Sequence, residues 1–158
     1  MTQQGIIMVK IEEKRKQLLQ AALEAMDNAY VLWGFRVGAA VLAEDGQVYG
    51  GCNVESWVSG LGICAERNAI NHAVLRGNRK IGEIAMVTDI GNRNELRPCG
   101  ACLQYIYDFA KNPKVKVVVA KAENGRILFD TVKVKTIEEL LPFPFKKLLI
   151  FAPKMGLS

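Results

Sequence analysis

Three cysteines in this chain have the types and spacing of metal ligands. Cys99 and Cys102 lie three residues apart in "PCGAC", so that one helical turn could present both thiolates to one ion. Both would also lie at a helix start, where the dipole favours thiolates. A Cys-x-x-Cys pair alone is a weak indication, because redox pairs share it. Cys64, which we expect to begin another helix, would supply a third thiolate.

A site made of these three cysteines would be open on one side. Three thiolates without a fourth protein ligand describe the catalytic type of zinc site, in which water takes the last position. His72 lies eight residues after Cys64, about 12 Å further along the same helix, so we expect it to be a surface or packing residue. Cys52 is expected to be a buried strand cysteine.

Glu66 lies two residues after Cys64, where a carboxylate could move protons to and from a water molecule at the metal. Taken alone, an acidic residue at a helix start is explained by the helix dipole. A ligand, a glutamate two residues later and a distant Pro-Cys-x-x-Cys together form the signature of zinc deaminases. This combination favours a catalytic role for Glu66.

Hydrophobic periodicity and turn residues predict the elements that must position these residues. Helices are predicted over 9–28, 64–76 and 98–110, and a short one over 136–141. Pro98 is expected in the first turn of the third helix, and Thr136 to begin the fourth. Strands are predicted in a hairpin over 35–55 around Asp45-Gly46, over 81–89, and in a hairpin over 114–134 around Asn124-Gly125. This order predicts an α/β layered sheet with helices on both faces.

Composition places limits on the class of protein. The chain has 158 residues, of which 50% are hydrophobic, without repeats or linkers, so we expect a single domain over 1–158. No segment reads as a leader or as a membrane span, which predicts a soluble cytoplasmic protein. The net charge is +5, but the basic residues are scattered at helix ends and on solvated faces. We therefore expect no nucleic-acid or membrane partner.

The chain resembles the cytidine deaminases of the small, three-cysteine type. The likeness runs through "FRVGAAV", "CNVES", "GLGICAERNAI", "PCGACLQ" and "EELLPFPF", which span residues 35–145. The resemblance implies a three-layer αβα sandwich around a five-stranded mixed sheet, with one zinc ion per chain. It also implies hydrolytic deamination of cytidine or deoxycytidine to uridine or deoxyuridine, with release of ammonia, in pyrimidine salvage.

The resemblance assigns roles at the metal. It implies that Cys64, Cys99 and Cys102 bind zinc and that Glu66 is the catalytic proton shuttle. Arg67 matches an arginine that hydrogen-bonds the ligand sulfurs. A cation there would offset the negative charge of three thiolates and restore the power of zinc as a Lewis acid.

The resemblance also assigns substrate-binding residues. Asn53 and Glu55 match the pair that binds ribose hydroxyls, and the backbone of Ala65 would face the base. Phe35 and Phe145 match aromatic residues that line the pocket, with Phe145 reaching in from a neighbouring subunit. The implied assembly is a homotetramer with shared active sites, and the apolar tail "ELLPFPFKKLLIFAPKM", residues 139–155, is expected to form an interface.

Several positions depart from the pattern of the family: Arg36, Ser56, Trp57, Ser59 and Leu103. They fall beside the expected base and sugar pocket, so the substrate is less well defined than the chemistry. A deaminase for another cytosine compound, such as a blasticidin-type nucleoside antibiotic, remains an alternative, although Glu55 and the spacing from Asn53 to Cys64 favour the nucleoside enzymes. A nucleic-acid-editing deaminase would need a basic groove with interleaved aromatic residues. A structural zinc module would need a fourth protein ligand and would have no use for Glu66.

Overall fold

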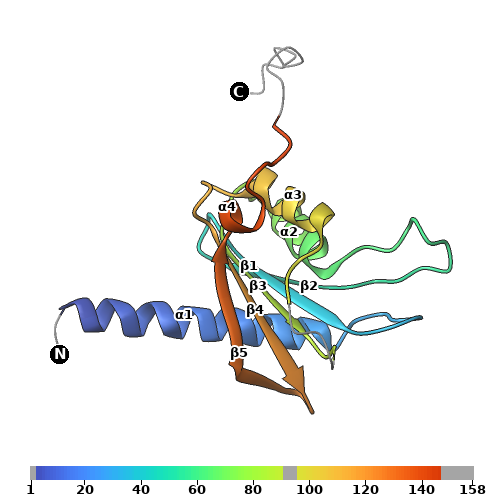
Figure 1. Ribbon diagram of the computed structural model, residues 1–158, viewed down its shortest axis with the longest axis horizontal. Helices are drawn as coiled ribbons and strands as arrows, with labels where there is room; N and C mark the ends of the chain where they lie inside the picture. The colour runs from blue at the N-terminus through green and yellow to red at the C-terminus, as the bar shows by residue number, and fades with distance from the viewer. Residues whose placement is uncertain (1–2, 91–95, 147–158) are drawn as a thin grey trace.

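The computed structural model describes residues 3–90 and 96–146, with side chains from residue 12 onward. Its elements, shown in Figure 1, are α1 (Gln3–Met26), β1 (Val37–Ala43), β2 (Val48–Cys52), α2 (Ala65–Leu75), β3 (Ile81–Thr88), α3 (Gly100–Phe109), β4 (Lys116–Glu123), β5 (Arg126–Thr136) and α4 (Ile137–Leu140). None of the helices in these ranges is long and apolar enough to cross a membrane.

The five strands form one mixed sheet in the order β2-β1-β3-β4-β5. β3 and β4 are parallel, and the other three neighbouring pairs are antiparallel. The parallel pair needs a crossover connection, which α3 provides. Helix α1 covers one face of the sheet, and α2, α3 and α4 lie on the other (Figure 1). The predicted three-layer αβα sandwich around a five-stranded mixed sheet is therefore confirmed.

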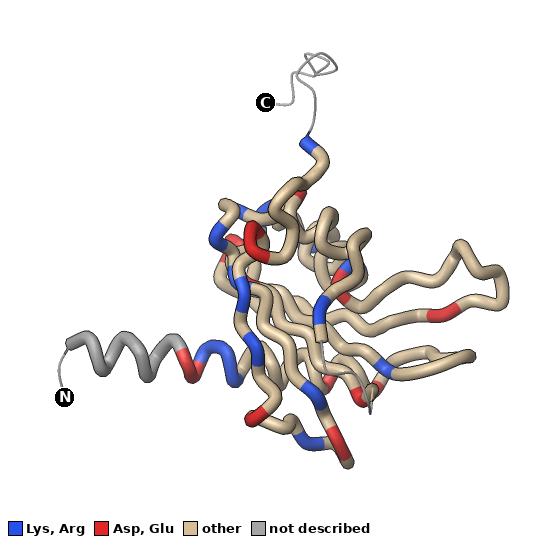
Figure 2. The backbone as a smooth tube through the Cα atoms, viewed as in Figure 1, with Lys and Arg blue, Asp and Glu red and all other residues tan. Residues whose placement is uncertain are grey.

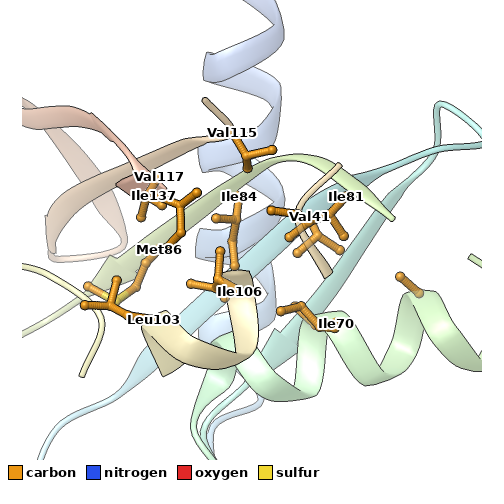
Figure 3. Close-up of a cluster of buried hydrophobic side chains, with 14 of the residues drawn as sticks. Val41, Ile70, Ile81, Ile84, Met86, Leu103, Ile106, Val115, Val117 and Ile137 are labelled. Atoms are coloured by element: carbon orange, nitrogen blue, oxygen red, sulfur yellow. The ribbon is translucent and has the colours of Figure 1, made fainter. Parts of the chain in front are cut away.

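Successive side chains of a strand point to opposite faces of the sheet, so alternate residues of the central strands belong to two separate cores. On β3, Ile84 and Met86 pack toward α2 and α3, whereas Ala85 and Val87 pack toward α1. Figure 3 shows the first of these cores, in which Ile70 from α2 and Ile106 from α3 meet the valines and isoleucines of the sheet. Helices α2 and α3 are thus held against the same face of the sheet, and both start near one end of it.

Two glycines let the helices approach the sheet closely. A Cβ on Gly38 would lie 1.9 Å from the backbone oxygen of Ala22 in α1. A Cβ on Gly51 would lie 2.2 Å from the backbone nitrogen of Ala69 in α2. Each clash is with backbone, so neither helix could keep its position if the glycine carried a side chain. Gly51 in particular sets how closely the helix that begins after Cys64 lies to β2.

Both predicted hairpin turns are present, and so is the cap of the short helix. Gly46, Asn124 and Gly125 have positive φ, as such turns require. Thr136 accepts from the backbone N–H of Glu139, whose side chain accepts from the N–H of Thr136 in return, which is a capping box.

Some predicted boundaries were wrong. Helix α1 begins at Gln3 and ends at Met26, rather than spanning 9–28. Pro98 lies outside α3, because Cys99 takes an extended backbone (φ −68°, ψ 165°) and caps a helix that begins at Gly100. An N-cap residue is not itself helical, so the proline before it is two residues from the first turn.

Candidate metal centre and active site

Three cysteines from two helices come together at one end of the sheet. Cys64 is the N-cap of α2, Cys99 is the N-cap of α3, and Cys102 lies in the first turn of α3. Their sulfur atoms all lie within 4.8 Å of one another. The structure therefore brings together the three residues that the sequence predicted as ligands, at two helix starts where the dipoles favour thiolates.

The electrostatics of this cluster suit a metal ion. A hydrogen bond from the Cys102 thiol, helped by Arg67 and opposed by burial, lowers the pKa of Cys64 to about 5. The pKa of Cys102 is raised in turn, because its proton is held beside the Cys64 thiolate. One cysteine is thus ionised before any metal binds, and thiolates are the form that binds zinc. Three sulfur donors, with no fourth ligand grouped with them in the part of the chain that the structure describes, fit an open zinc site.

Arg67 lies beside the cluster. Its Nη2 atom is 3.8 Å from Cys64 Sγ and 3.5 Å from the carbonyl oxygen of Gly62. The neighbouring Cys64 raises the pKa of Arg67. Its Nε atom is buried and has no hydrogen-bond partner among the described residues. The guanidinium is therefore placed to offset the charge of the thiolates.

Glu66 is the second residue of α2 and is only 4% exposed. Burial raises the pKa of its carboxyl group, and the negative charge of Cys64 adds to the effect. The side chain lines the same cavity as Cys64 and Cys99. A buried carboxyl group whose pKa is raised holds a proton more readily than an exposed one, which suits it to both taking and giving a proton.

A cavity of about 350 Å³ opens beside the cysteines, which is within the range of small-molecule sites. Of the predicted substrate-binding residues, Phe35, Asn53, Glu55 and Ala65 line it. The sequence did not single out the other lining residues, among them Val37, Val54, Ile63, Met86, Thr88, Ile90, Leu96 and Arg97. Most of these belong to strands or follow them, and only the pairing of the strands brings them to one cavity.

Asn53 holds the loop that leads into β1. Its Oδ1 accepts from the N–H of Val37 at 2.8 Å, and its Nδ2 donates to the carbonyl oxygen of Phe35 at 3.1 Å. An amide has a second hydrogen and a second lone pair, so each end retains one site for a ligand. The position of Phe35 in the cavity therefore depends on Asn53.

Glu55 holds an earlier part of the same loop, at Leu32 and Trp33. Its Oε2 accepts from the backbone N–H groups of Leu32 and Trp33, at 2.5 and 2.7 Å. No hydrogen bond from the protein to Oε1 is present among the described residues, so this oxygen can still accept one from a ligand. These contacts join residues 22 and 23 positions apart, and no local pattern in the sequence could have predicted them.

A comparison with known families decides which family this site belongs to. The family described as "Cytidine and deoxycytidylate deaminase zinc-binding region" matches residues 12–124. The chain belongs to the cytidine and deoxycytidylate deaminase family. Its members are zinc-dependent hydrolytic deaminases, so zinc is the cofactor, and Cys64, Cys99 and Cys102 form a group that could hold it.

Individual relatives agree with this membership. A cytidine deaminase from Sporosarcina psychrophila is 36% identical over 133 residues, which cover 84% of this chain and 91% of the relative. A crystal structure of cytidine deaminase from Burkholderia pseudomallei has a TM-score of 0.71 at 36% identity and covers 82% of this chain and 98% of its own. A blasticidin-S deaminase from Bacillus cereus is 29% identical over 143 residues, which cover 87% of this chain and 96% of the relative.

Within this deaminase family member, Phe145 lies away from the cavity that contains Glu66. It is 76% exposed, and its backbone N–H and carbonyl group both bond the side chain of Gln104, at 2.8 and 3.0 Å. Its expected place in a neighbouring subunit's pocket stays a prediction. Of the predicted interface segment 139–155, residues 147–155 lie outside the described part of the chain.

Three other residues that the sequence analysis discussed make contacts outside the cysteine cluster. Cys52 is half-buried at the end of β2, not fully buried as predicted, and its Sγ lies 3.4 Å from the carbonyl oxygen of Asn28. His72 packs edge to face against Tyr49 and donates to the carbonyl oxygen of Gly50. It does not belong to the cysteine cluster that could hold a metal. Arg36 forms an ion pair with Asp89 at 2.8 Å, which joins the start of β1 to the end of β3.

Proposed function

We propose that the protein is a cytidine deaminase, which hydrolyses cytidine or deoxycytidine to uridine or deoxyuridine and ammonia. The observation that carries this proposal is the buried Glu66, which lines a cavity of about 350 Å³ together with two of the three clustered cysteines. The relatives named cytidine deaminase at 36% identity support it. Pyrimidine salvage is the corresponding role in the cell.

The metal would be held by Cys64, Cys99 and Cys102. When bound, zinc would supply Lewis acidity, which lowers the pKa of a water molecule at the site toward neutral pH. Arg67, 3.8 Å from the Cys64 sulfur, would withdraw negative charge from the thiolates and so preserve this acidity.

Glu66 would move the protons of the reaction. It would take a proton from the water that attacks C4 of the cytosine ring and pass this proton to N3. It would then transfer the second proton of the same water to the departing amine, which leaves as ammonia. The buried position that raises its pKa lets it hold a proton between these steps.

The sugar would be held at the other end of the cavity. Oε1 of Glu55 and the remaining amide sites of Asn53 would bind ribose hydroxyls, while Phe35 and the backbone of Ala65 would contact the base. A site built to hydrogen-bond a hydroxyl discriminates against compounds that lack it by up to roughly 10⁴-fold, because buried polar groups are otherwise left unpaired. We therefore expect cytidine to be preferred strongly over free cytosine.

Assembly is part of the proposal. We infer a homotetramer in which Phe145 completes the site of a neighbouring subunit. The strongly exposed Phe143 and Phe145 support an interface at this end of the chain. Analytical ultracentrifugation should find a tetramer, and a fully active monomer would contradict the shared site.

A second candidate is the deamination of a larger cytosine nucleoside of the blasticidin type. Two observations favour it: the relative from Bacillus cereus, and a pair of exposed tryptophans beside the cavity, Trp33 and Trp57. The chemistry at the metal would be the same, and only the sugar end would differ.

One experiment separates these candidates. The purified zinc-loaded protein is incubated with cytosine, cytidine, deoxycytidine, blasticidin S and a single-stranded cytosine-containing oligonucleotide, while ultraviolet absorbance and ammonia are followed. We expect the two nucleosides to have the highest kcat/KM and the oligonucleotide to be inert. Equal rates for cytosine and cytidine would contradict the roles of Asn53 and Glu55, and turnover of blasticidin S alone would favour the second candidate.

A further inference from the structure

One wall of the cavity that contains Glu66 is the outer end of the β1–β3 pair. Val37, the first residue of β1, pairs with Thr88, the last residue of β3, and both line the cavity. Phe35 and Ile90, two residues further out on each segment, line it as well. Phe35 is the residue whose ring would contact the base. It lies beyond the regular strands, so the ladder of the sheet does not by itself fix its position.

Arg36 and Asp89 lie between these lining residues and belong to the opposite face of the sheet. Successive side chains of an extended segment alternate between two faces. Gly38, two residues after Arg36, faces α1, because a Cβ there would lie 1.9 Å from the backbone oxygen of Ala22. Helix α1 covers the face opposite α2 and α3 (Figure 1), and the Arg36 guanidinium reaches Asp27, which directly follows α1, at 3.9 Å. Neither Arg36 nor Asp89 lines the cavity.

Four hydrogen bonds join Arg36 to the end of β3. Its backbone N–H donates to Oδ1 of Asp89 at 2.8 Å, and its Nε donates to Oδ2 of the same carboxylate at 2.8 Å. Its carbonyl oxygen accepts from Oγ1 of Thr88 at 2.9 Å and from the N–H of Asp89 at 3.3 Å. The carboxylate of Asp89 thus holds both the backbone and the side chain of Arg36 just outside the last strand pair.

The two residues next to Arg36 are held from the other edge. Asn53 accepts from the N–H of Val37 and donates to the carbonyl oxygen of Phe35. Residues 35–37 are therefore tied to Asn53 on the β2 side and to Asp89 on the β3 side. The backbone of Phe35 cannot shift far without the loss of contacts on one of these sides.

Charge favours this pair, although its exposure limits what the ion pair contributes. Figure 2 shows few charged positions on the segment between β2 and α2 and on the loop after α1, so few other charges compete for Arg36. The side chains of Arg36 and Asp89 are 45% and 28% exposed, and exposed ion pairs contribute little to stability. The bond from the backbone N–H of Arg36 to the same carboxylate is charge-assisted and therefore stronger. The main effect of the pair is accordingly local order.

We propose that Arg36 and Asp89 are positioning residues that hold Phe35 in place for the base of the substrate. The inference rests on the proposed deaminase function and adds two residues that do not touch the substrate. A ring that is ordered before binding does not have to be ordered by the ligand, which favours affinity. The base is common to cytosine and its nucleosides, so the pair should affect all of them alike.

Arg36→Met tests the ion pair, because it keeps the backbone N–H and a long side chain but removes the charge. We expect KM for cytidine to rise roughly threefold with kcat little changed, since contact with the base is made equally before and during the reaction. The kcat/KM for free cytosine should fall by the same factor. Arg36→Lys keeps the charge and should recover most of the loss. Asp89→Ala removes the acceptor of both bonds and should raise KM by roughly tenfold.

Arg15→Met is the matched control. Arg15 in α1 forms an ion pair of 2.6 Å with Glu83 in β3, and neither residue lines the cavity. Its side chains are 27% and 17% exposed, less than those of Arg36 and Asp89, so its loss should lower the melting temperature at least as much. KM should nevertheless stay that of the parent. A merely structural role of Arg36 would give both variants the same pattern.

A double-mutant cycle shows whether Arg36 acts through Phe35. Residues that act together have non-additive effects. If the ion pair serves only to hold the ring, Arg36→Met should hardly change KM in a protein that already carries Phe35→Leu. Amide hydrogen exchange over residues 34–37 measures the order of this segment without a substrate. We expect faster exchange there in Arg36→Met than in the parent or in Arg15→Met.

The outcomes separate this proposal from the proposed function. If cytidine is deaminated but Arg36→Met leaves KM and exchange unchanged, only this inference falls. An effect of Arg36→Met that is equally large beside Phe35→Leu also overturns it, and so does a rise in KM that is accompanied by a change in sedimentation. If no cytosine compound is deaminated but exchange still distinguishes Arg36→Met from Arg15→Met, the proposed function is wrong and the pair orders Phe35 for another ligand. If neither activity nor an exchange difference is found, both proposals are wrong.

Discussion

The two ends of the cavity are built in different ways. At the metal end, Cys64 and Cys99 cap two helices that are packed on the same face of the sheet, and the neighbouring Glu66 is almost fully buried. At the sugar end, Asn53 and Glu55 lie in a segment without regular structure and hold a second loop by long-range hydrogen bonds. The hydrophobic core supports the metal end. Hydrogen bonds between two loops hold the sugar end in place.

This difference bears on how the chemistry and the specificity can change. A substitution at the metal end disturbs cysteines whose positions are set by α2, α3 and the core shown in Figure 3. A substitution at the sugar end can alter the exposed Trp33 and Trp57 without disturbing that core. The metal end should therefore determine whether the protein is active, and the sugar end should determine which nucleoside it accepts.

The largest effect is expected from Cys102→Ser. Loss of a thiolate should remove zinc, abolish activity and lower the melting temperature, because metal binding contributes to folding free energy. Elemental analysis and thermal unfolding measure these changes. Cys52→Ser is the control, since Cys52 lies outside the cluster and should leave zinc bound. Stoichiometric zinc in the Cys102→Ser protein would contradict the ligand assignment.

Glu66→Gln should lower kcat by several orders of magnitude while zinc stays bound. General acid-base steps contribute roughly 10²–10⁴-fold each, and Glu66 is proposed to serve more than one. Zinc content, circular dichroism and steady-state rates test this together. Glu123→Gln, at the exposed end of β4, provides an acid-to-amide control. Activity of Glu66→Gln within tenfold of the parent would rule out its role as proton shuttle.

Glu55→Gln should act on substrate choice rather than on the chemistry. The glutamine oxygen can still accept from Leu32 and Trp33, so the loop stays in place, but the charge that would bind a ribose hydroxyl is gone. A hydrogen bond to a charged group contributes about 1.5–3 kcal/mol, which corresponds to a loss of roughly 10- to 100-fold in kcat/KM for cytidine. The rate on free cytosine should hardly change. An equal loss on both compounds would place Glu55 in the chemistry and remove the distinction between the two ends.

The metal end was largely predictable from sequence, and the sugar end only in part. Cys64, Glu66 and the Cys99-Cys102 pair have short, fixed spacings, and helix starts position them through local backbone geometry. The hairpins followed from Asp45-Gly46 and Asn124-Gly125, whose turn conformation is also local.

What the sequence did not predict depends on contacts between distant residues. The bonds of Glu55 to Leu32 and Trp33, and the meeting of Trp33 with Trp57, require two loops to fold against each other. The error at Pro98 has a similar origin, because Cys99 takes an extended backbone and delays the start of α3. Propensity favours a proline in the first turn, and the extended conformation of Cys99 overrides it.

The smallest effect is expected from Thr136→Ala, because Thr136 does not line the cavity. The change removes the capping box of α4, whose Ile137 packs in the same core as α2 and α3, and should lower the free energy of unfolding by about 1 kcal/mol. Thr136→Ser is the control that keeps the cap. Urea unfolding measures the loss, and kcat/KM for cytidine should equal that of the parent. A fall in activity would show that α4 supports the site.

The stability that the capping box of α4 contributes should depend on pH. Hydrogen bonds from the backbone and side chain of Thr136, with Lys135 nearby, hold the pKa of Glu139 at about 2, below its ordinary value of 4.5. A carboxyl group with a lowered pKa stabilises the fold above its unfolded pKa, and this contribution is lost as the pH falls through the folded value. The difference in stability between the parent and Glu139→Gln should therefore be full at pH 6 and shrink from about pH 4.5 toward pH 2. A difference that stays constant over this range would show that the charge of Glu139 does not contribute to the cap.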